Sequence, residues 1–268
     1  MVYITKITTQ KKQSDRFNIY VNDGTGEKYA FSVDEDVLIK YQLKKGLELD
    51  DFTHMEVLYQ DTIRKALSTA IQYLASRMRS EKEVRDYLKQ KEVEAPVIQE
   101  VIHRLYSLKY LNDEEFALAY VRTQMNTTDK GPNVVKVELK EKGIIPSILD
   151  NALQVYPYDL QLSKAIQLCH KAQKKKRNDS QFVFEQKLKQ ALSRKGYSFS
   201  IIDEAMSEMK KSVQDEEGEL EAIKKQGEKA KKKFGEDVQK IKQFLYRKGF
   251  SIDEIEDYVR NLEQEDWN

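Results

Sequence analysis

Apolar and polar residues alternate along most of this chain at the spacing of amphipathic helices. One six-residue phrase closes four of these helical stretches, and its leading leucines lie 51, 53 and 53 residues apart. A repeat of this length is typical of stacked supersecondary units, each of which needs a neighbour to bury its apolar face. The four copies occupy residues 88–93, 139–144, 192–197 and 245–250. The pattern therefore predicts a tandem repeat protein.

Each copy predicts a hairpin of two helices. Its glycine can adopt the left-handed conformation that ends many helices, and the preceding lysine suits the negative end of the helix dipole. Apolar residues recur ten and fourteen positions after each leucine, which places a second helix there. Gly143, Gly196 and Gly249 are thus interpreted as structural. In the first copy Glu92 replaces glycine, and we expect a different and costlier helix end at that position.

The second helices carry start signals near their first residues. Proline is favoured in the first turn of a helix, and serine followed three residues later by an acidic residue is typical of a capping box. A third helix joins successive hairpins: Asn112 caps one, and residues 160–177 and 220–234 form the next two. The start signals are Pro96, Pro146 with Ser147 and Asp150, Ser200 with Asp203, and Ser251 with Glu254.

The first sixty residues have a different pattern. Short β-branched and aromatic runs at 2–7, 16–21 and 28–33 predict a three-stranded sheet, with a hairpin turn between the last two. Asp34 then begins a helix that ends at Gly46, and another helix begins near Asp50 or Asp51. A sheet this small is marginally stable alone, so we expect it to pack on the first helices.

These elements predict a mainly α fold: tandem three-helix repeats in an elongated array, with a small β-rich N-terminal extension. The N-terminal part is expected to span residues 1–60. The repeats are then placed at 61–125, 126–177 and 178–233, with a partial repeat at 234–268.

Composition agrees with long, solvated helices, because charged residues make up 34% of the chain and only ten glycines and four prolines are present. The single cysteine, Cys169, excludes an internal disulfide and suits a reducing compartment. There is no long apolar run, and the N-terminus lacks the apolar core of a signal peptide. We therefore expect a soluble, cytoplasmic protein.

The net charge of +1 hides a gradient along the chain. The balance of basic over acidic residues is −2 in residues 1–60, +1 in 61–125, +5 in 126–210 and −3 in 211–268. The basic excess is concentrated in two clusters. Clusters of this kind can neutralise the phosphates of a nucleic acid whatever its base sequence, or can simply be solvated helix ends that complement the helix dipole. Two runs at the ends of equivalent helices favour an anionic partner. They are Lys171, Lys174, Lys175, Lys176 and Arg177 in the first and Lys229, Lys231, Lys232 and Lys233 in the second.

No catalytic constellation is evident in the sequence. The glycines at 24–26 lie in a hairpin and lack the spacing of a phosphate loop, and the three histidines are isolated from other metal ligands. Asp113 lies in the first turn of a helix, where an acidic residue needs no metal to explain it. Cys169 and His170 point about 100° apart on a helix, which argues against a nucleophile–base pair. We therefore expect a binding protein without cofactor or metal rather than an enzyme.

The segment from residue 70 to residue 143 combines an arginine cluster, a Tyr-Leu-Asn-Asp helix cap and a Gly-Pro helix opening. The residues of this combination are Arg77, Arg79, Ser80 and Glu83, then Tyr110, Leu111, Asn112, Asp113 and Phe116, and finally Gly131, Pro132, Leu139, Lys142 and Gly143. With these residues the segment resembles the bacterial RecX family, whose members regulate the RecA recombinase. The length and the β-like N-terminal part are similar to the long form found in Gram-positive bacteria. The clearest departure is Lys91-Glu92, where the family usually has Lys-Gly.

The resemblance implies a curved body of three-helix repeats that binds RecA and lies along the groove of its filament on single-stranded DNA. It also implies an effect, in most cases inhibition, on ATP hydrolysis, strand exchange and filament assembly in recombination, DNA repair and the SOS response. Weak contacts from successive repeats to successive protomers then add through effective concentration. We expect a monomer. The candidate RecA or DNA contacts are Arg77, Arg79, Arg85, Arg122, Lys171, Lys174, Lys175, Lys176 and Arg177.

Arg77 and Arg79 are two residues apart and cannot face the same way on a helix, so one of them is expected to pair with a carboxylate. Two other functions remain open. A sequence-nonspecific DNA-binding repeat protein that acts without RecA would bind bare DNA tightly with a steep salt dependence. A carboxylate-based nuclease would show metal-dependent cleavage.

Overall fold

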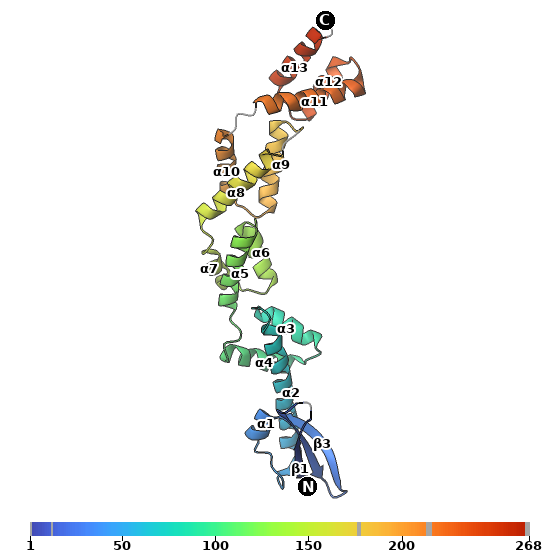
Figure 1. The fold of residues 1–268 in the computed structure, drawn as a ribbon, viewed down its shortest axis with the longest axis vertical. Helices are drawn as coiled ribbons and strands as arrows, with labels where there is room; N and C mark the ends of the chain where they lie inside the picture. The colour runs from blue at the N-terminus through green and yellow to red at the C-terminus, as the bar shows by residue number, and fades with distance from the viewer. Residues whose placement is uncertain (1, 12, 176–177, 213–215, 266–268) are drawn as a thin grey trace. The chain divides into compact units, whose positions relative to one another are not determined.

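The computed structural model describes residues 2–11, 13–175, 178–212 and 216–265 (Figure 1). Within these ranges the chain forms thirteen α-helices and one small antiparallel sheet near its N-terminus. The expected mainly α fold with a β-rich extension is therefore confirmed. The chain divides into two compact units, Met1–Phe116 with Lys142–Ile144, and Ala117–Glu141 with Ile145–Asn268.

The sheet of the first unit has four strands in the order β3-β2-β1-β4, and each neighbouring pair is antiparallel. The three expected strands are present, and Ile19 and Val33 on the inner face are fully buried. The expectation of three strands was wrong, because Glu48 and Leu49, which follow the first helix, form a fourth strand paired with the start of β1. A strand of two residues leaves no alternating pattern in the sequence, so it could not be predicted. The strands are β1 (Val2–Thr9), β2 (Arg16–Asn22), β3 (Glu27–Asp34) and β4 (Glu48–Leu49).

The first helix is shorter than expected. Asp34 caps α1 (Glu35–Lys40), as predicted, but the helix ends well before Gly46. Gln42 adopts a left-handed conformation with φ of 48°, and the chain then places Leu43 in the core under the sheet. Burial of a leucine in this core thus ends the helix earlier than the helical pattern indicates.

The long helix α2 (Asp51–Leu74) begins where predicted, and the Asp50 carboxylate accepts a hydrogen bond from the Thr53 N–H. Its first half packs under the sheet, where Val57 is fully buried. The sheet therefore packs on its first helices, as expected. The second half of α2 belongs to a different core.

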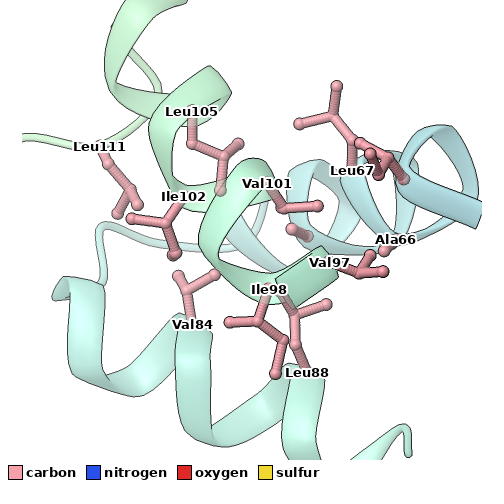
Figure 2. Packing of buried hydrophobic residues seen from close by; sticks show 12 residues of the cluster. Ala66, Leu67, Val84, Leu88, Val97, Ile98, Val101, Ile102, Leu105 and Leu111 are labelled. Atoms are coloured by element: carbon pink, nitrogen blue, oxygen red, sulfur yellow. The ribbon is translucent and has the colours of Figure 1, made fainter. Parts of the chain in front are cut away.

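That second core joins α2 to the first hairpin, α3 (Glu81–Gln90) and α4 (Ala95–Ser107). Figure 2 shows Val84 and Leu88 of α3 pointing toward Ile98 of α4, and these side chains are at most 2% exposed. Large apolar groups excluded from water in this way supply most of the stability of a helical hairpin.

In the second unit, too, a long helix leads each hairpin. Separate cores hold α8 with α9 and α10, and α11 with α12 and α13. We therefore propose three-helix units at residues 51–107, 113–153, 158–212 and 216–265, in place of divisions after 125, 177 and 233. The remaining helices are α5 (Asp113–Thr127), α6 (Pro132–Glu141), α7 (Pro146–Leu153), α8 (Tyr158–Gln173), α9 (Gln181–Arg194), α10 (Phe199–Ser212), α11 (Glu216–Phe234), α12 (Val238–Arg247) and α13 (Ile252–Glu265).

A polar contact closes every hairpin at the same two repeat positions. The cation three residues before each key leucine meets a side chain fourteen residues later, on the second helix. The pairs are Arg85 with Gln99 at 2.9 Å, Lys136 with Asp150 at 2.9 Å, Lys189 with Asp203 at 3.0 Å and Lys242 with Glu256 at 2.7 Å.

This arrangement corrects two of the expected start signals. Asp150 and Asp203 bind lysines of the first helix instead of capping the second, because α7 begins at Pro146 and α10 begins at Phe199, upstream of Ser200. The capping box of Ser251 and Glu254 is confirmed by reciprocal hydrogen bonds.

The first helix of each hairpin ends in the same way in the first, third and fourth copies. The N–H after the left-handed residue donates to the carbonyl of the key leucine, as in Val93 to Leu88 at 3.1 Å and Tyr197 to Leu192 at 3.2 Å. Glu92 itself is left-handed, with φ of 59°. The expectation of a different helix end at Glu92 was therefore wrong. Only its cost remains, of about 1 kcal/mol for a side chain in this conformation.

Candidate functional site

The Lys-Gly turns of the last three copies also hold the first helices of successive hairpins together. Each turn lies against the N-terminus of an earlier helix, and its lysine carbonyl accepts a hydrogen bond from the residue that precedes that helix. We call each of these contacts a turn joint. The donors and acceptors are Ser80 Oγ to Lys142 O at 2.7 Å, Gly131 N to Lys195 O at 2.7 Å and Ser180 Oγ to Lys248 O at 2.8 Å.

The turn joints explain why these three copies carry glycine. The backbones approach so closely that a Cβ atom would overlap the facing helix. Added at Gly143 it would lie 2.7 Å from the Lys82 Cβ, at Gly196 2.5 Å from the Val134 nitrogen, and at Gly249 2.8 Å from the Ser180 Oγ. Glycine is thus needed both for its positive φ and for its missing side chain. No hydrogen bond joins the first turn to a described helix N-terminus, which agrees with the presence of Glu92 there.

Carboxylates complete two of the turn joints. Asp113, at the start of α5, accepts a hydrogen bond from the Glu81 N–H at 2.8 Å. Glu219 on α11 accepts from the Gln181 N–H at 2.9 Å in the same relation. Burial, together with the nearby Glu81 and Glu83 carboxylates, raises the pKa of Asp113. Asp113 therefore satisfies an otherwise open helix N-terminus, in agreement with its structural interpretation.

An ionic cluster supports the first turn joint. Arg77 binds Glu83 through two nitrogens, at 3.0 and 3.3 Å, and Lys142 reaches the same carboxylate at 3.1 Å. Burial acts to raise the pKa of Glu83, but the hydrogen bonds from Arg77, Lys142 and the Ser80 N–H outweigh it and lower that pKa to about 2. Glu83 is therefore ionised at neutral pH, with two cations held against it.

Replacing Glu83 with glutamine is expected to remove a pH-dependent part of the stability of the first unit. A carboxylate with a lowered pKa stabilises the fold above its unfolded value of 4.5 and loses that contribution as the pH falls through about 2. The stability difference between wild type and Glu83→Gln should therefore be full above pH 4.5 and shrink toward pH 2, as measured by urea unfolding across this range. The control is Glu94→Gln, which removes an exposed carboxylate and should show no such pH dependence. A stability difference for Glu83→Gln that does not change with pH, or the same pH dependence in Glu94→Gln, would contradict the cluster's role.

Arg77, Arg79 and Arg85 all have partners within the fold. Arg77 and Arg79 lie in the connection between α2 and α3 rather than on a helix, so the premise of a shared helix was wrong; the expected carboxylate partner is confirmed for Arg77. Arg79 donates to the Tyr73 carbonyl at 2.9 Å and stacks 3.6 Å from the Tyr73 ring, which itself stacks on Tyr87. Arg85 binds Glu81 and Gln99.

Other candidates are exposed to solvent. Arg122 lies on α5, and its side chain makes no hydrogen bond or ion pair with another described residue. The same holds for the side chains of Lys171, Lys174 and Lys175 at the end of α8, where cations suit the negative pole of the helix. Lys176 and Arg177 lie outside the described residues. The end of α8 is therefore the basic site with the fewest internal partners among the predicted residues.

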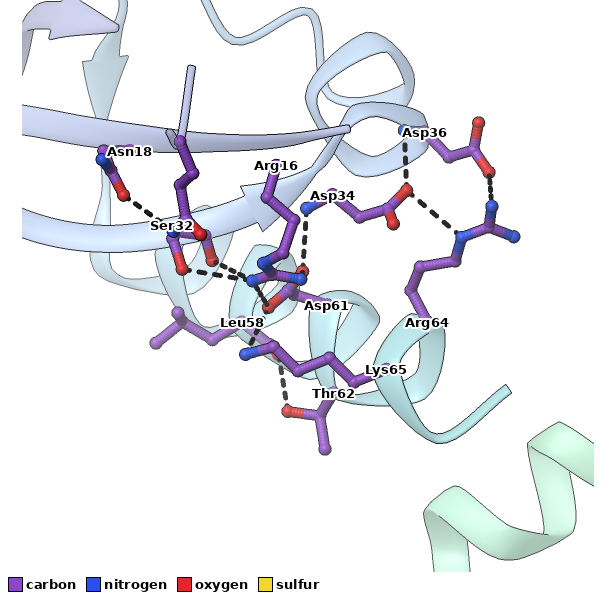
Figure 3. Close-up of polar contacts among 11 residues, drawn as sticks. Arg16, Asn18, Ser32, Asp34, Asp36, Leu58, Asp61, Thr62, Arg64 and Lys65 are labelled. Atoms are coloured by element: carbon purple, nitrogen blue, oxygen red, sulfur yellow. Dashed lines mark hydrogen bonds and ion pairs between the residues drawn. The ribbon is translucent and has the colours of Figure 1, made fainter. Parts of the chain in front are cut away.

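A buried ion pair that the sequence analysis missed ties the sheet to α2 (Figure 3). Arg16 on β2 binds Asp61 on α2 through two nitrogens, at 2.9 and 3.1 Å, and both residues are buried. Lys65 and the Asp34 N–H bind the same carboxylate, at 2.8 and 2.9 Å. Burial opposes ionisation, but the hydrogen bonds from Arg16 and Lys65 prevail and lower the pKa of Asp61. No local motif marks a pair 45 residues apart.

The C-terminal three-helix unit has a cavity of about 560 Å³ between α11 and α13. Its lining includes Leu220, Ile223 and Leu262. Four carboxylates and a single lysine also line it, so the cavity repels phosphate groups rather than attracting them. A nucleic-acid backbone is therefore better matched by α8 than by this end of the chain.

Two features of the described residues concern nucleophilic and metal chemistry. Burial raises the pKa of the Cys169 thiol to about 11, so this thiol is a poor nucleophile at neutral pH. No group of three or more His, Cys, Asp or Glu side chains in the described ranges is arranged to hold a metal ion.

None of the described helices is both long and apolar enough to span a membrane.

Family models cover nearly the whole chain. The model described as "Regulatory protein RecX N-terminal domain" matches residues 2–50. Models for the first and second three-helix domains of RecX match residues 66–105 and 112–153. The model for the third three-helix domain matches twice, at 159–206 and 217–259, which agrees with a long helix at the start of each unit.

Full-length relatives and solved structures agree with these matches. The regulatory protein RecX of Bacillus pumilus is 49% identical over 96% of this chain and 97% of its own length, and that of Bacillus subtilis is 46% identical over 98% and 100%. A crystal structure of regulatory protein RecX matches 77% of this chain and 100% of its own, with a TM-score of 0.70 at 35% identity. RecX from Lactobacillus salivarius matches 56% and 98%, with a TM-score of 0.54 at 39% identity. The chain therefore belongs to the RecX family of regulatory proteins.

Proposed function

We propose that this protein binds the RecA recombinase and its filament on single-stranded DNA, and that it inhibits ATP hydrolysis, strand exchange and filament assembly without being an enzyme. The observation that carries the proposal is membership of the RecX family over nearly the full chain. Tandem three-helix units joined by repeated turn joints suit a polymeric partner, because successive units can bind successive protomers. The proposed site of action is the cytoplasm.

The end of α8 and Arg122 are the proposed contact residues. Lys171, Lys174 and Lys175 are exposed and make no ion pair with another described residue, so they can bind phosphates or acidic protein groups without losing an internal partner. Lys176 and Arg177 continue the same basic run in the sequence. Arg77, Arg79 and Arg85 would have to leave their internal partners, and we assign them to the fold.

The test compares wild type with the triple variant Lys171→Gln/Lys174→Gln/Lys175→Gln in DNA-dependent ATP hydrolysis by RecA of the same organism. Wild type should inhibit at substoichiometric concentration, and the variant should need a concentration higher by about tenfold or more, because three cations are lost from the contact. The matched control, Lys11→Gln/Lys44→Gln/Lys45→Gln, removes the same charge from exposed positions outside the helical repeats and both basic runs, and should inhibit almost like wild type. No effect of wild type on ATP hydrolysis would refute the proposal.

A second candidate function is sequence-nonspecific DNA binding without RecA, which the exposed lysines of α8 also favour. It predicts tight binding of wild type to bare DNA, with a salt slope that falls by about 2–3 in the α8 triple variant. Titration of labelled single- and double-stranded DNA at several salt concentrations separates the two functions. Strong binding of bare DNA together with no effect on RecA would favour the second.

A further inference from the structure

Each turn joint has two sides, a turn and a helix start. In this chain one turn and one helix start have no such partner among the described residues. Three turns are docked, and three helices, α3, α6 and α9, receive them. The turn of the first copy, at residues 91–93, is the exception: no described residue donates a hydrogen bond to the Lys91 carbonyl. The start of α12 is the other exception, since no described turn is docked on Asp237 or Val238.

An open turn and an open helix start on one chain form a complementary pair of surfaces. A second copy of the chain could offer its first turn to α12 and repeat the geometry of the internal joints. Such a head-to-tail contact joins two different surfaces, so it does not close on itself and can propagate into a polymer. A repeat protein that does not polymerise needs a device against this outcome.

The residues at the two open positions differ from those at every docked one. The open turn carries Glu92, although a Cβ atom at the equivalent glycines would come within 2.5–2.8 Å of the receiving helix. Glu92 is exposed, and its left-handed backbone fits glycine better. Glu92 thus destabilises its own turn, and its side chain makes no hydrogen bond or ion pair with another described residue in return.

The open helix start differs from two of the three docked ones in the hydrogen bonds of its side chain; at the third, α6, the donor is the backbone N–H of Gly131. Ser80 and Ser180 accept a hydrogen bond from their own helix and also donate one to the docked lysine carbonyl. The corresponding residue of α12 is Asp237, whose carboxylate accepts from the Lys240 N–H and pairs with the Lys240 ammonium. An ionised carboxylate has no proton to donate, so it would repel an incoming carbonyl oxygen.

We infer that Glu92, in the open turn, and Asp237, at the open helix start, prevent a second copy of this chain from docking head to tail. If two copies repeated the Gly249–Ser180 contact between them, Glu92 of one copy would meet Asp237 of the next, so that steric overlap and repulsion between two carboxylates act together. This inference does not depend on the proposed function, since it concerns only how the chain meets its own copies.

The test is the double variant Glu92→Gly/Asp237→Ser, which recreates the glycine and serine of an internal turn joint. Sedimentation velocity and light scattering should give wild type and both single variants the mass of one chain at every concentration. The double variant should at least double in average mass as its concentration is raised to about 1 mM, a range that detects even weak interfaces. Circular dichroism and thermal unfolding check that all variants fold; both substitutions suit the local backbone, so loss of folding is not expected.

A second double variant, Glu92→Asn/Asp237→Ser, separates the two effects. Asparagine tolerates the left-handed conformation and removes the charge, but it keeps a Cβ atom. It should therefore remain a single chain. Self-association of wild type, a single-chain mass for Glu92→Gly/Asp237→Ser throughout the range, or equal self-association of the asparagine variant would each overturn the inference.

Discussion

Replacing Asp61 with asparagine is expected to destabilise the packing of the N-terminal sheet on α2 by about 3–5 kcal/mol, because it leaves the buried Arg16 guanidinium without its counter-charge. Asp61 is 2% exposed and Arg16 is 8% exposed, so water cannot replace the lost partner. The Asp34 N–H and Lys65 bind the same carboxylate and would also lose an anion. The effect should therefore exceed that of a surface ion pair severalfold.

Hydrogen exchange read by mass spectrometry is the appropriate measurement. Peptides covering β2 and β3 should exchange much faster in Asp61→Asn, while those of α9 and α10 stay unchanged. The control is Asp36→Asn, which breaks an exposed pair with Arg64 and should change stability by no more than about 0.5 kcal/mol.

A compensating pair tests the reason for the loss. In Arg16→Met/Asp61→Leu both charges are removed, so no charge is left buried without a partner. This double variant should recover most of the protection lost in Asp61→Asn. If the double variant is as unstable as Asp61→Asn, the unpaired charge does not cause the loss of stability, and the packing of the two side chains does.

Replacing Gly196 with alanine is the second substitution with a large expected effect, a loss of about 3 kcal/mol. Roughly 1 kcal/mol comes from the positive φ of 89°. About 2 kcal/mol more comes from steric overlap, since the new Cβ atom would lie 2.5 Å from the Val134 nitrogen and that atom belongs to the backbone of α6. The α6–α9 turn joint should then open.

Gly46 provides a matched control because its φ is 88° and no atom lies within 4 Å of an added Cβ. Gly46→Ala should therefore cost only the conformational part, about 1 kcal/mol. Urea unfolding gives the total loss for each variant, and hydrogen exchange in α6 and α9 locates it. Equal losses in the two variants would show that the turn joint does not need the close approach.

Several features were predictable because their causes are local in the sequence. The helical hairpins follow from apolar spacing around Val84, Leu88 and Ile98, which all become buried. The start of α2 follows from Asp50, whose side chain caps the helix without help from the rest of the fold. The function was predicted from motifs shared with a family, since the chemistry of single residues indicated no specific activity.

Several charged side chains have partners that a capping or i,i+4 pattern does not indicate. Arg85 is part of the polar contact that closes a hairpin, and Arg77 binds Glu83 and lies next to Lys142, so these candidate contact residues also have internal partners, and their role in binding stays a prediction. Asp150 and Asp203 follow a serine at capping distance but bind lysines instead. The recurrence of a cation and a polar partner fourteen residues apart was visible in the repeats and could have revealed these pairs.

The repeat, its helices and the family can be read from the amino-acid sequence, because periodic burial and helix-end chemistry act within a few residues. The reason why the Lys-Gly phrase recurs is visible only in the three-dimensional structure. Its glycine is needed where the backbone of one turn touches the start of an earlier helix, 62 residues away in the case of Ser80 and Lys142. The same structure shows that Glu92 is compatible with the fold, because no described helix start is hydrogen-bonded to its turn. Steric exclusion depends on which atoms face each other in space, and spacing along the chain does not contain that information.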